Sequence, residues 1–368
     1  MILCKKIPTI LTVTYPKDHA MHFANRIVLI LVAVCLILPL PVRDADAHHS
    51  RSRFDTSGLV EVEGELVLFS WRNPHVRIRI KGTDENGEEV TWDMEGDSLS
   101  ILRRTNARPE NVEVGSQVRA AGFKTVRPSN DMLVYNLLLE DGREILVNVE
   151  AVPRWSNEIS GDESTWLVGG TASESRGDIF RVWSSQFEGD TAPYSPTEYP
   201  LTEFAKSAKA AFDPTVDVVA EGCKPKGMPM IMGQPYPMEF VRDGEDILLK
   251  LEEYDTVRRI HMPTMPDMHL HEPSLLGHSD GRWEGDTLVV QTGQIDFPYF
   301  SASGIPLTTS AYVVERFRVS DDNSRLEYER LVTDVQVFEE PVSYSDWWVW
   351  RPGELVQPYE CEERSGTD

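Results

Sequence analysis

The sequence predicts an all-β protein with an N-terminal OB-like barrel and a C-terminal antiparallel up-and-down barrel or sandwich. Short runs rich in Val, Ile, Thr, Phe, Tyr and Trp alternate with polar residues, which is typical of strands that are buried on one face. Glycine and proline, 24 of each in 368 residues, separate these runs and supply turns. Clear helix signals occur in one short stretch of the connecting segment, Thr202 to Phe212, where Thr202 can cap the first turn.

The first predicted domain spans residues 48–150. Its predicted elements are strands at Val60–Trp71, Val76–Lys81 and Val90–Met94, a short helix at Ser98–Arg104, and strands at Gln117–Phe123 and Leu133–Val149. Three strands, one helix and two strands is the order of the OB-fold. The order is complete before residue 151, so we expect this domain to fold as an independent small barrel.

The second predicted domain spans residues 218–368, after a linker at residues 151–217 that contains the short helix. Alternation returns in seven segments, at Met238–Arg242, Ile247–Glu253, Thr256–Met262, Thr287–Thr292, Tyr312–Val319, Leu326–Val335 and Tyr344–Trp350. Strands at this spacing, joined by short turns, indicate a barrel or a sandwich, and the barrel is our preferred alternative.

Residues 1–47 have the three parts of a secretory signal peptide. Arg26 precedes the apolar run Ile27–Leu40, and Ala45-Asp46-Ala47 follows it as a cleavage pattern. The run is short for a membrane span. We therefore expect a periplasmic or secreted protein that begins at His48 and is not transmembrane after cleavage, with Met1 or Met21 as the initiator.

The charge of the chain argues against one class of partner. Lys and Arg number 36 against 60 Asp and Glu, for a formal net charge of −24. A protein that binds nucleic acid needs cations for the phosphate backbone. Nucleic acid is therefore not an expected partner.

Cleavage would leave Cys223 and Cys361 as the only cysteines. In an oxidising compartment, a single pair predicts a disulfide. The alternative is two separate buried thiols.

Several motifs resemble those of known families. His48-His49-Ser50, Phe54-Asp55 and Trp71-Arg72-Asn73-Pro74-His75 resemble a family of secreted bacterial proteins known only as a domain of unknown function. Three further runs resemble a second group of uncharacterised exported bacterial proteins; they are Cys223–Pro229, Arg258–Met262 and Gly277–Val290. Members of that group usually have Asp-Gly directly after the run that resembles Ile260-His261-Met262. At that position this chain has Pro263-Thr264. The resemblance implies export but carries no activity to any residue.

Histidine and methionine gather in one region of the second half. His261, His269, His271 and His278 lie within eighteen residues, and seven methionines lie between residues 228 and 268. The predicted metal ligands are His269, His271, Met265 and Met268, with His48 and His75 as a separate candidate set. Imidazole and thioether together suit Cu⁺, whereas the α-amine and imidazole of an N-terminal His48, with His75 as third ligand, suit Cu²⁺; copper is the one cofactor that we consider. The alternative is that methionine fills irregular gaps in the core.

The same region supports a catalytic interpretation. His261 and His278 could act as acid and base, with orienting carboxylates from Asp255, Glu284 or Asp286. Arg258 or Arg259 would stabilise developing negative charge. The predicted ligand-binding wall is Trp283, Tyr299 and Phe300. No nucleophile elbow, zincin motif, P-loop or dinucleotide fingerprint is present in the sequence.

These observations lead to two competing functions. The first is an exported soluble protein that binds a small molecule or a metal ion through the His/Met-rich segment. The second is an enzyme of lyase, isomerase or hydrolase type that uses histidine acid/base chemistry in the C-terminal barrel. An envelope interaction protein without a small-molecule site would leave the His/Met clustering unexplained.

Overall fold

The computed structural model describes residues 54–83, 87–126, 129–161, 178–185, 198–213, 217, 219, 223–262, 271–351 and 353–361. Strands predominate in these residues, and the predicted all-β class is confirmed. Residues 46–368 form one compact unit, which contains two barrels. The predicted signal peptide lies outside the described residues.

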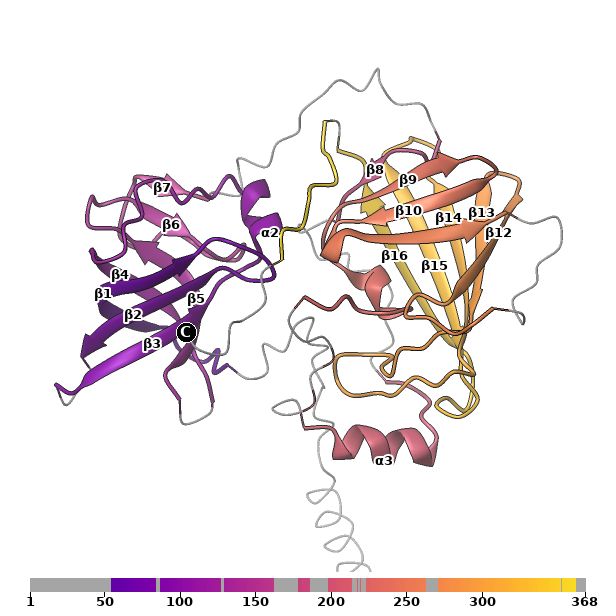
Figure 1. The fold of residues 1–368 in the computed structure, drawn as a ribbon, viewed down its shortest axis with the longest axis horizontal. Coiled ribbons are helices and arrows are strands. Elements are labelled where there is room, and N and C mark those ends of the chain that lie inside the picture. Colours follow the sequence, from indigo (N-terminus) through magenta and orange to yellow (C-terminus); the bar gives the residue numbers. More distant parts are fainter. Residues whose placement is uncertain are drawn as a thin grey trace, which may run out of the picture. The chain divides into compact units, whose positions relative to one another are not determined.

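The first barrel has five strands in the predicted order (Figure 1). They are β1 (Val60–Ser70), β2 (Arg77–Thr83), β3 (Glu89–Glu95), β4 (Gln117–Lys124) and β5 (Asp131–Leu138), with helix α2 (Leu99–Arg104) between β3 and β4. Strand β1 pairs with both β2 and β4, and β3 pairs in parallel with β5. The β3–β5 pairing closes the ring, because β4 also pairs with β5.

Helix α2 has a cap that the sequence signals. The Ser98 Oγ accepts a hydrogen bond from the Ile101 amide at 3.2 Å, which satisfies one of the free donors of the first turn. Leu99 and Leu102 are buried, and Leu102 is part of the core of the first barrel. The helix ends before Asn106, whose φ of 58° takes the chain out of the helical path.

The first sheet continues past residue 150, where the sequence placed the start of the linker. Strand β6 (Glu144–Leu146) pairs with β5, and β7 (Ile159–Ser160) pairs with β6. The buried Glu144 carboxylate accepts hydrogen bonds from the amides of Arg154, Trp155 and Ser156 at 2.9–3.1 Å. Residues 151–160 are therefore bonded to the first barrel.

The second barrel has nine strands, neighbouring one another in chain order. They are β8 (Val182–Trp183), β9 (Met238–Asp243), β10 (Asp246–Leu251), β11 (Thr256–His261), β12 (His278–Glu284), β13 (Thr287–Gly293), β14 (Tyr312–Val319), β15 (Arg325–Thr333) and β16 (Val342–Val349). Ser184 and Val349 exchange two backbone hydrogen bonds of 2.9 and 2.8 Å, which nearly close the ring. The barrel alternative is therefore the observed one.

One pair of strands departs from the expected antiparallel arrangement. Strands β11 and β12 are parallel, and only Ile260–Ser279 and His261–Asp280 are in register. Parallel neighbours need a crossover connection, and residues 262–277 provide it.

The predicted short helix is α3 (Glu203–Ala211), and the Thr202 Oγ1 caps it by accepting from the Ala205 amide.

A buried ion pair lies inside the second barrel. Arg258 and Glu315, exposed by 1% and 0%, are joined by two hydrogen bonds. Arg258 also donates to the hydroxyls of Ser279 and Thr292, and Tyr328 donates to Glu315 at 2.9 Å. A buried charge is tolerated when its partners satisfy it in this way. Arg258 is therefore a residue of the barrel core.

Cys223 and Cys361 form a disulfide, as predicted from their being the only cysteines after residue 47. No helix in the described part of the chain is long and apolar enough to cross a bilayer.

Candidate functional site

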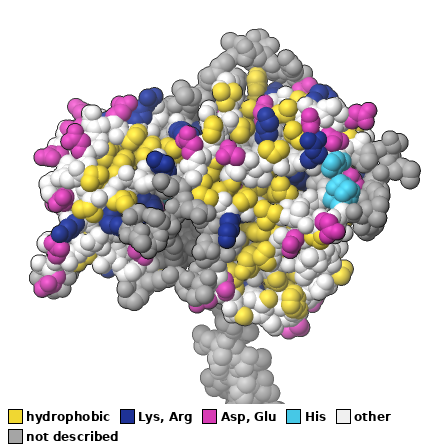
Figure 2. Space-filling view, in the orientation of Figure 1, with side chains coloured by type: hydrophobic (Ala, Val, Ile, Leu, Met, Phe, Trp, Pro, Cys, Tyr) yellow, Lys and Arg dark blue, Asp and Glu magenta, His cyan; other side chains and the backbone are white. Residues whose placement is uncertain are grey.

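Three histidine rings stack in a column at the surface of the second barrel. The ring centroids of His261 and His278 are 4.7 Å apart, and those of His271 and His278 are 3.5 Å apart, with interplanar angles of 18° and 8°. His278 is therefore the middle ring. Figure 2 shows histidine side chains gathered in one patch, with charged side chains beside them.

The parallel pairing of β11 with β12 brings these rings together. His261 is the last residue of β11, and His278 is the first residue of β12. Because the two strands run in the same direction with only two residues in register, the end of one lies beside the start of the other. His271 lies near the end of the crossover and adds the third ring.

Two carboxylates orient two of the rings. The His261 Nδ1 lies 3.2 Å from an Asp246 carboxylate oxygen, and the His278 Nε2 lies 3.2 Å from an Asp280 oxygen. Asp246 also accepts from the Met262 amide at 3.1 Å. With the nitrogens that face the carboxylates protonated, the Nε2 of His261 and the Nδ1 of His278 keep free lone pairs.

The surroundings of His278 favour its neutral form. Its side chain is 11% exposed, and this burial lowers the pKa of His278 below its usual value. Repulsion from His271 and His261 lowers the pKa further, and the Asp280 carboxylate opposes the shift. The neutral imidazole is the form that binds a metal ion, and it is also the form that accepts a proton as a general base.

The methionines near this site belong to the core. Met228, Met232 and Met238 are fully buried, and the Arg258 guanidinium lies 3.6 Å from the Met232 sulfur. The Met262 sulfur lies 2.6 Å from the point where a Cβ on Gly281 would stand, so the thioether fills space that glycine leaves free. For these described methionines, the packing alternative is therefore the observed one.

Two of the carboxylates chosen from the sequence lie away from the histidines. Asp255 precedes β11 and accepts from the Tyr359 amide at 3.1 Å. A strand rises about 3.3 Å per residue, so Asp255 lies roughly 20 Å from His261 at the other end. Asp286 lies beyond the far end of β12 from His278 and faces Arg318 at 3.5 Å. These two carboxylates therefore contact the Tyr359 amide and Arg318, at the ends of β11 and β12 away from His261 and His278.

Arg259 does lie at the site. It forms ion pairs with Asp243 at 2.7 Å and with Asp246 at 3.2 Å. Because Asp246 also bonds His261, the guanidinium adjoins one of the two histidine–carboxylate pairs.

The aromatic residues expected to form one wall are separated. Phe300 is buried in the core beside Tyr199 and Phe338. Tyr299 packs edge to face on Phe212. Trp283 is 43% exposed and lines a cavity of about 330 Å³ with Asp286, Phe317 and other residues, at the end of β12 away from His278. Of the three, Trp283 alone lines this cavity, and it lies near the opposite end of β12 from His278.

Of the remaining metal candidates, the structure describes only His75. His75 is in the first barrel, where its Nδ1 lies 3.1 Å from the Gly96 carbonyl oxygen. His269, Met265, Met268 and His48 lie outside the described residues. Within the described ranges, no group of three or more His, Cys, Asp or Glu side chains is arranged to hold a metal ion. Because the three rings stack face to face, their nitrogen atoms do not point toward one common position.

Sequence reasoning missed both of the carboxylates that bond the histidines. Asp280 is two residues after His278 on the same strand, a spacing that places the two side chains on one face. Asp246 follows the Asp243-Gly244 turn and lies near His261 because β10 and β11 are antiparallel neighbours. The first could have been found from spacing, whereas the second required the strand register.

Comparison with known proteins reaches only the first barrel. Residues 39–131 match the model of a family of unknown function, DUF6152. The first barrel is similar to that family. No curated protein and no solved structure matches this chain.

The matched region contains the Trp71–His75 motif, whose central residue is buried. The Asn73 amide donates to the Ser100 Oγ at 3.1 Å and to the Tyr359 carbonyl oxygen. Asn73 therefore bonds the first barrel to Tyr359.

Proposed function

We propose that the chain is an exported protein that binds a transition-metal ion through His261, His271 and His278. One observation carries this proposal: three imidazoles meet on one surface, and aspartates hold two of them with a lone pair free. Metal-ligating histidines characteristically donate their other ring nitrogen to a carboxylate, which fixes the ring and raises its basicity.

Ring rotation would convert the stack into a coordination site. His271 is exposed, so its ring has room to turn, and the 39% exposed His261 ring can shift while it keeps its hydrogen bond to Asp246. His278 is held more tightly, because it is 11% exposed and bonded to Asp280. Binding would replace two ring contacts with nitrogen–metal bonds around His278 as the fixed ligand.

The ligand set favours Cu²⁺. Imidazole nitrogen suits zinc, copper, iron and nickel, and affinity among divalent ions is highest for Cu²⁺. The Cu⁺ alternative depended on thioethers, and the described methionines pack in the core instead. We therefore place copper in its divalent form at this site, in an oxidising compartment outside the cytoplasm.

The test is a competition titration of the mature chain, beginning at His48, with Cu²⁺ and a chelating indicator. We expect one Cu²⁺ per chain, and H261A/H278A should lose at least 100-fold in affinity. H75A is the matched control, because His75 is in the first barrel, and it should bind as wild type does. Thermal unfolding without metal establishes that each variant is folded. Equal affinity of the double variant and wild type would overturn the proposal.

A second candidate function is histidine acid/base catalysis on a small organic molecule. The two histidine–carboxylate pairs favour it, because neighbouring rings could carry opposite protonation states. The chelator-treated protein separates the two functions. An enzyme of this kind would turn over a panel of esters, lactones and hydroxy acids without metal, and H261A or H278A alone would slow it by roughly 10²–10⁴.

A further inference from the structure

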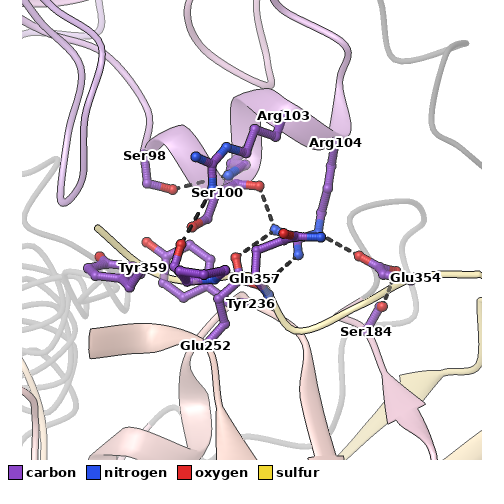
Figure 3. Close-up of polar contacts among 12 residues, drawn as sticks. Ser98, Ser100, Arg103, Arg104, Ser184, Tyr236, Glu252, Glu354, Gln357 and Tyr359 are labelled. Carbon is purple, nitrogen blue, oxygen red and sulfur yellow. Dashed lines mark hydrogen bonds and ion pairs between the residues drawn. The ribbon is translucent and has the colours of Figure 1, made fainter. Parts of the chain in front are cut away.

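The last described residues, 353–361, form a segment that we call the C-terminal strap. It bonds to both barrels within the compact unit of residues 46–368. Figure 3 shows the polar contacts around it, including Arg104, Glu252 and Glu354. Outside these contacts the strap has no strand, and its one bridge pairs Cys361 with Asn73.

The strap contacts the first barrel through helix α2 and through Asn73. Arg104 at the end of α2 donates to Glu354 at 2.5 Å, and its other nitrogens reach Glu252 at 2.8 Å and 3.1 Å. Arg104 therefore bonds the strap and the second barrel together. Asn73 donates to the Tyr359 carbonyl oxygen.

The strap contacts the second barrel at the turn before β11. The Gln357 amide donates to Glu252 at 3.0 Å, and the Tyr359 amide donates to Asp255 at 3.1 Å. The Tyr359 ring is 1% exposed and packs against Tyr236 at 5.6 Å and Tyr254 at 4.7 Å. Ile101 of helix α2 belongs to the same buried cluster.

Few apolar contacts hold the strap apart from Tyr359. Leu355 is 61% exposed, so it adds little burial. Chain ends without such anchors are usually poorly ordered. The covalent anchor is Cys361, which is bonded to Cys223 at a sequence separation of 138 residues. Both cysteines are half-buried, which leaves the bond within reach of a reductant.

We propose that the C-terminal strap is a redox-controlled latch between the barrels. While the disulfide is intact, Tyr359 stays between Ile101 and the two tyrosines, and Arg104 stays on Glu252. Reduction frees the strap, removes Tyr359 from the cluster, and uncouples the first barrel from the second.

The opening step requires a dithiol reductant of the thiol–disulfide oxidoreductase class. A thiolate of the reductant attacks one sulfur of the Cys223–Cys361 bond and forms a mixed disulfide. The second thiol of the reductant displaces that cysteine and leaves as the oxidised disulfide. Two electrons pass to the latch, and each cysteine sulfur takes up one proton.

Hydrogen–deuterium exchange of the full mature chain, oxidised and reduced, tests the latch. We expect reduction to accelerate exchange at least tenfold in residues 353–361 and in α2, and to leave β13 to β15 unchanged. C223S/C361S should exchange like the reduced protein whether or not reductant is present. R104A, which keeps the disulfide, should keep the strap protected because the covalent anchor remains.

Two results would overturn the latch. A reduced protein whose strap and α2 stay protected would show that the noncovalent contacts suffice. Faster exchange throughout β9 to β16 would show that the disulfide stabilises the entire second barrel instead of holding the strap.

Discussion

At the scale of single residues, the histidine site depends on two aspartates that hold two imidazoles. Asp280 is 4% exposed and fixes His278, while Asp246 bonds both His261 and the Met262 amide. The ring orientation at each position therefore comes from a hydrogen bond to a carboxylate. Substitution of either aspartate therefore tests its role while all three proposed histidine ligands remain in place.

We expect D280N to weaken Cu²⁺ binding by 10- to 100-fold, the usual effect of losing an outer-shell partner of a metal-bound histidine. D246N should have an effect of similar size through His261. D243N is the matched control, because Asp243, the last residue of β9, pairs with Arg259. Competition titration measures all three. The outer-shell role fails if D280N and D243N bind Cu²⁺ equally well.

The lowered pKa of His278 predicts a pH dependence for the metal-free protein. In the folded state the pKa lies below the usual 6.5, so the unfolded chain binds this proton more readily as the pH falls. Stability should therefore decline as the pH drops below about 6.5. The melting temperature should fall less between pH 6.5 and 5 in H278Q than in wild type. Parallel pH profiles for the two proteins would contradict this assignment.

At the scale of elements, the site exists because β11 and β12 are parallel in an otherwise antiparallel barrel. The alternation of residues predicted most of the strands, since one face of each is buried. It did not predict this pairing, because periodicity defines the faces of a strand and not its neighbour. The clustering of histidines in the sequence predicted that His261, His271 and His278 lie together. The choice of Asp255 and Asp286 as their carboxylate partners was made without the strand register, which decides which carboxylate lies beside which histidine.

Gly281 tests how packing supports this strand pair. A Cβ at this position would stand 2.6 Å from both Ile260 and the Met262 sulfur, beside the two registered residue pairs. G281A should cost about 1–3 kcal/mol of stability, as overpacking of a core does. It should also weaken Cu²⁺ binding by displacing His261 from His278.

The control for this variant is G233A. Gly233 has no atom within 4 Å of its Cβ position, so its substitution should change neither stability nor binding. Chemical denaturation and Cu²⁺ titration measure both variants. Equal stability of G281A and G233A would show that β11 and β12 tolerate the added methyl group.

At the scale of the whole molecule, the sequence predicted two barrels and a disulfide but not the contacts that join them. The OB-like order was readable because turns and strands are local signals. The contacts of Asn73 with Tyr359 and of Arg104 with Glu252 join residues more than a hundred positions apart. Composition and periodicity carry no information about such pairs.

The extent of the first barrel gives a prediction at this scale. A fragment of residues 48–161 should unfold cooperatively, and at a higher temperature than a fragment of residues 48–150. The shorter fragment leaves the buried Glu144 without its amide donors, at a cost of about 3 kcal/mol or more. Circular dichroism during heating measures the difference. Identical midpoints would show that residues 151–161 do not stabilise the barrel.

Electron paramagnetic resonance of the mature chain loaded with one Cu²⁺ is the most direct test of the metal site. We predict one bound Cu²⁺ per chain, with nitrogen couplings from imidazole that disappear in H261A/H278A and persist in H75A. A spectrum of the double variant that matches wild type, or Cu²⁺ bound well below one per chain, would contradict the account.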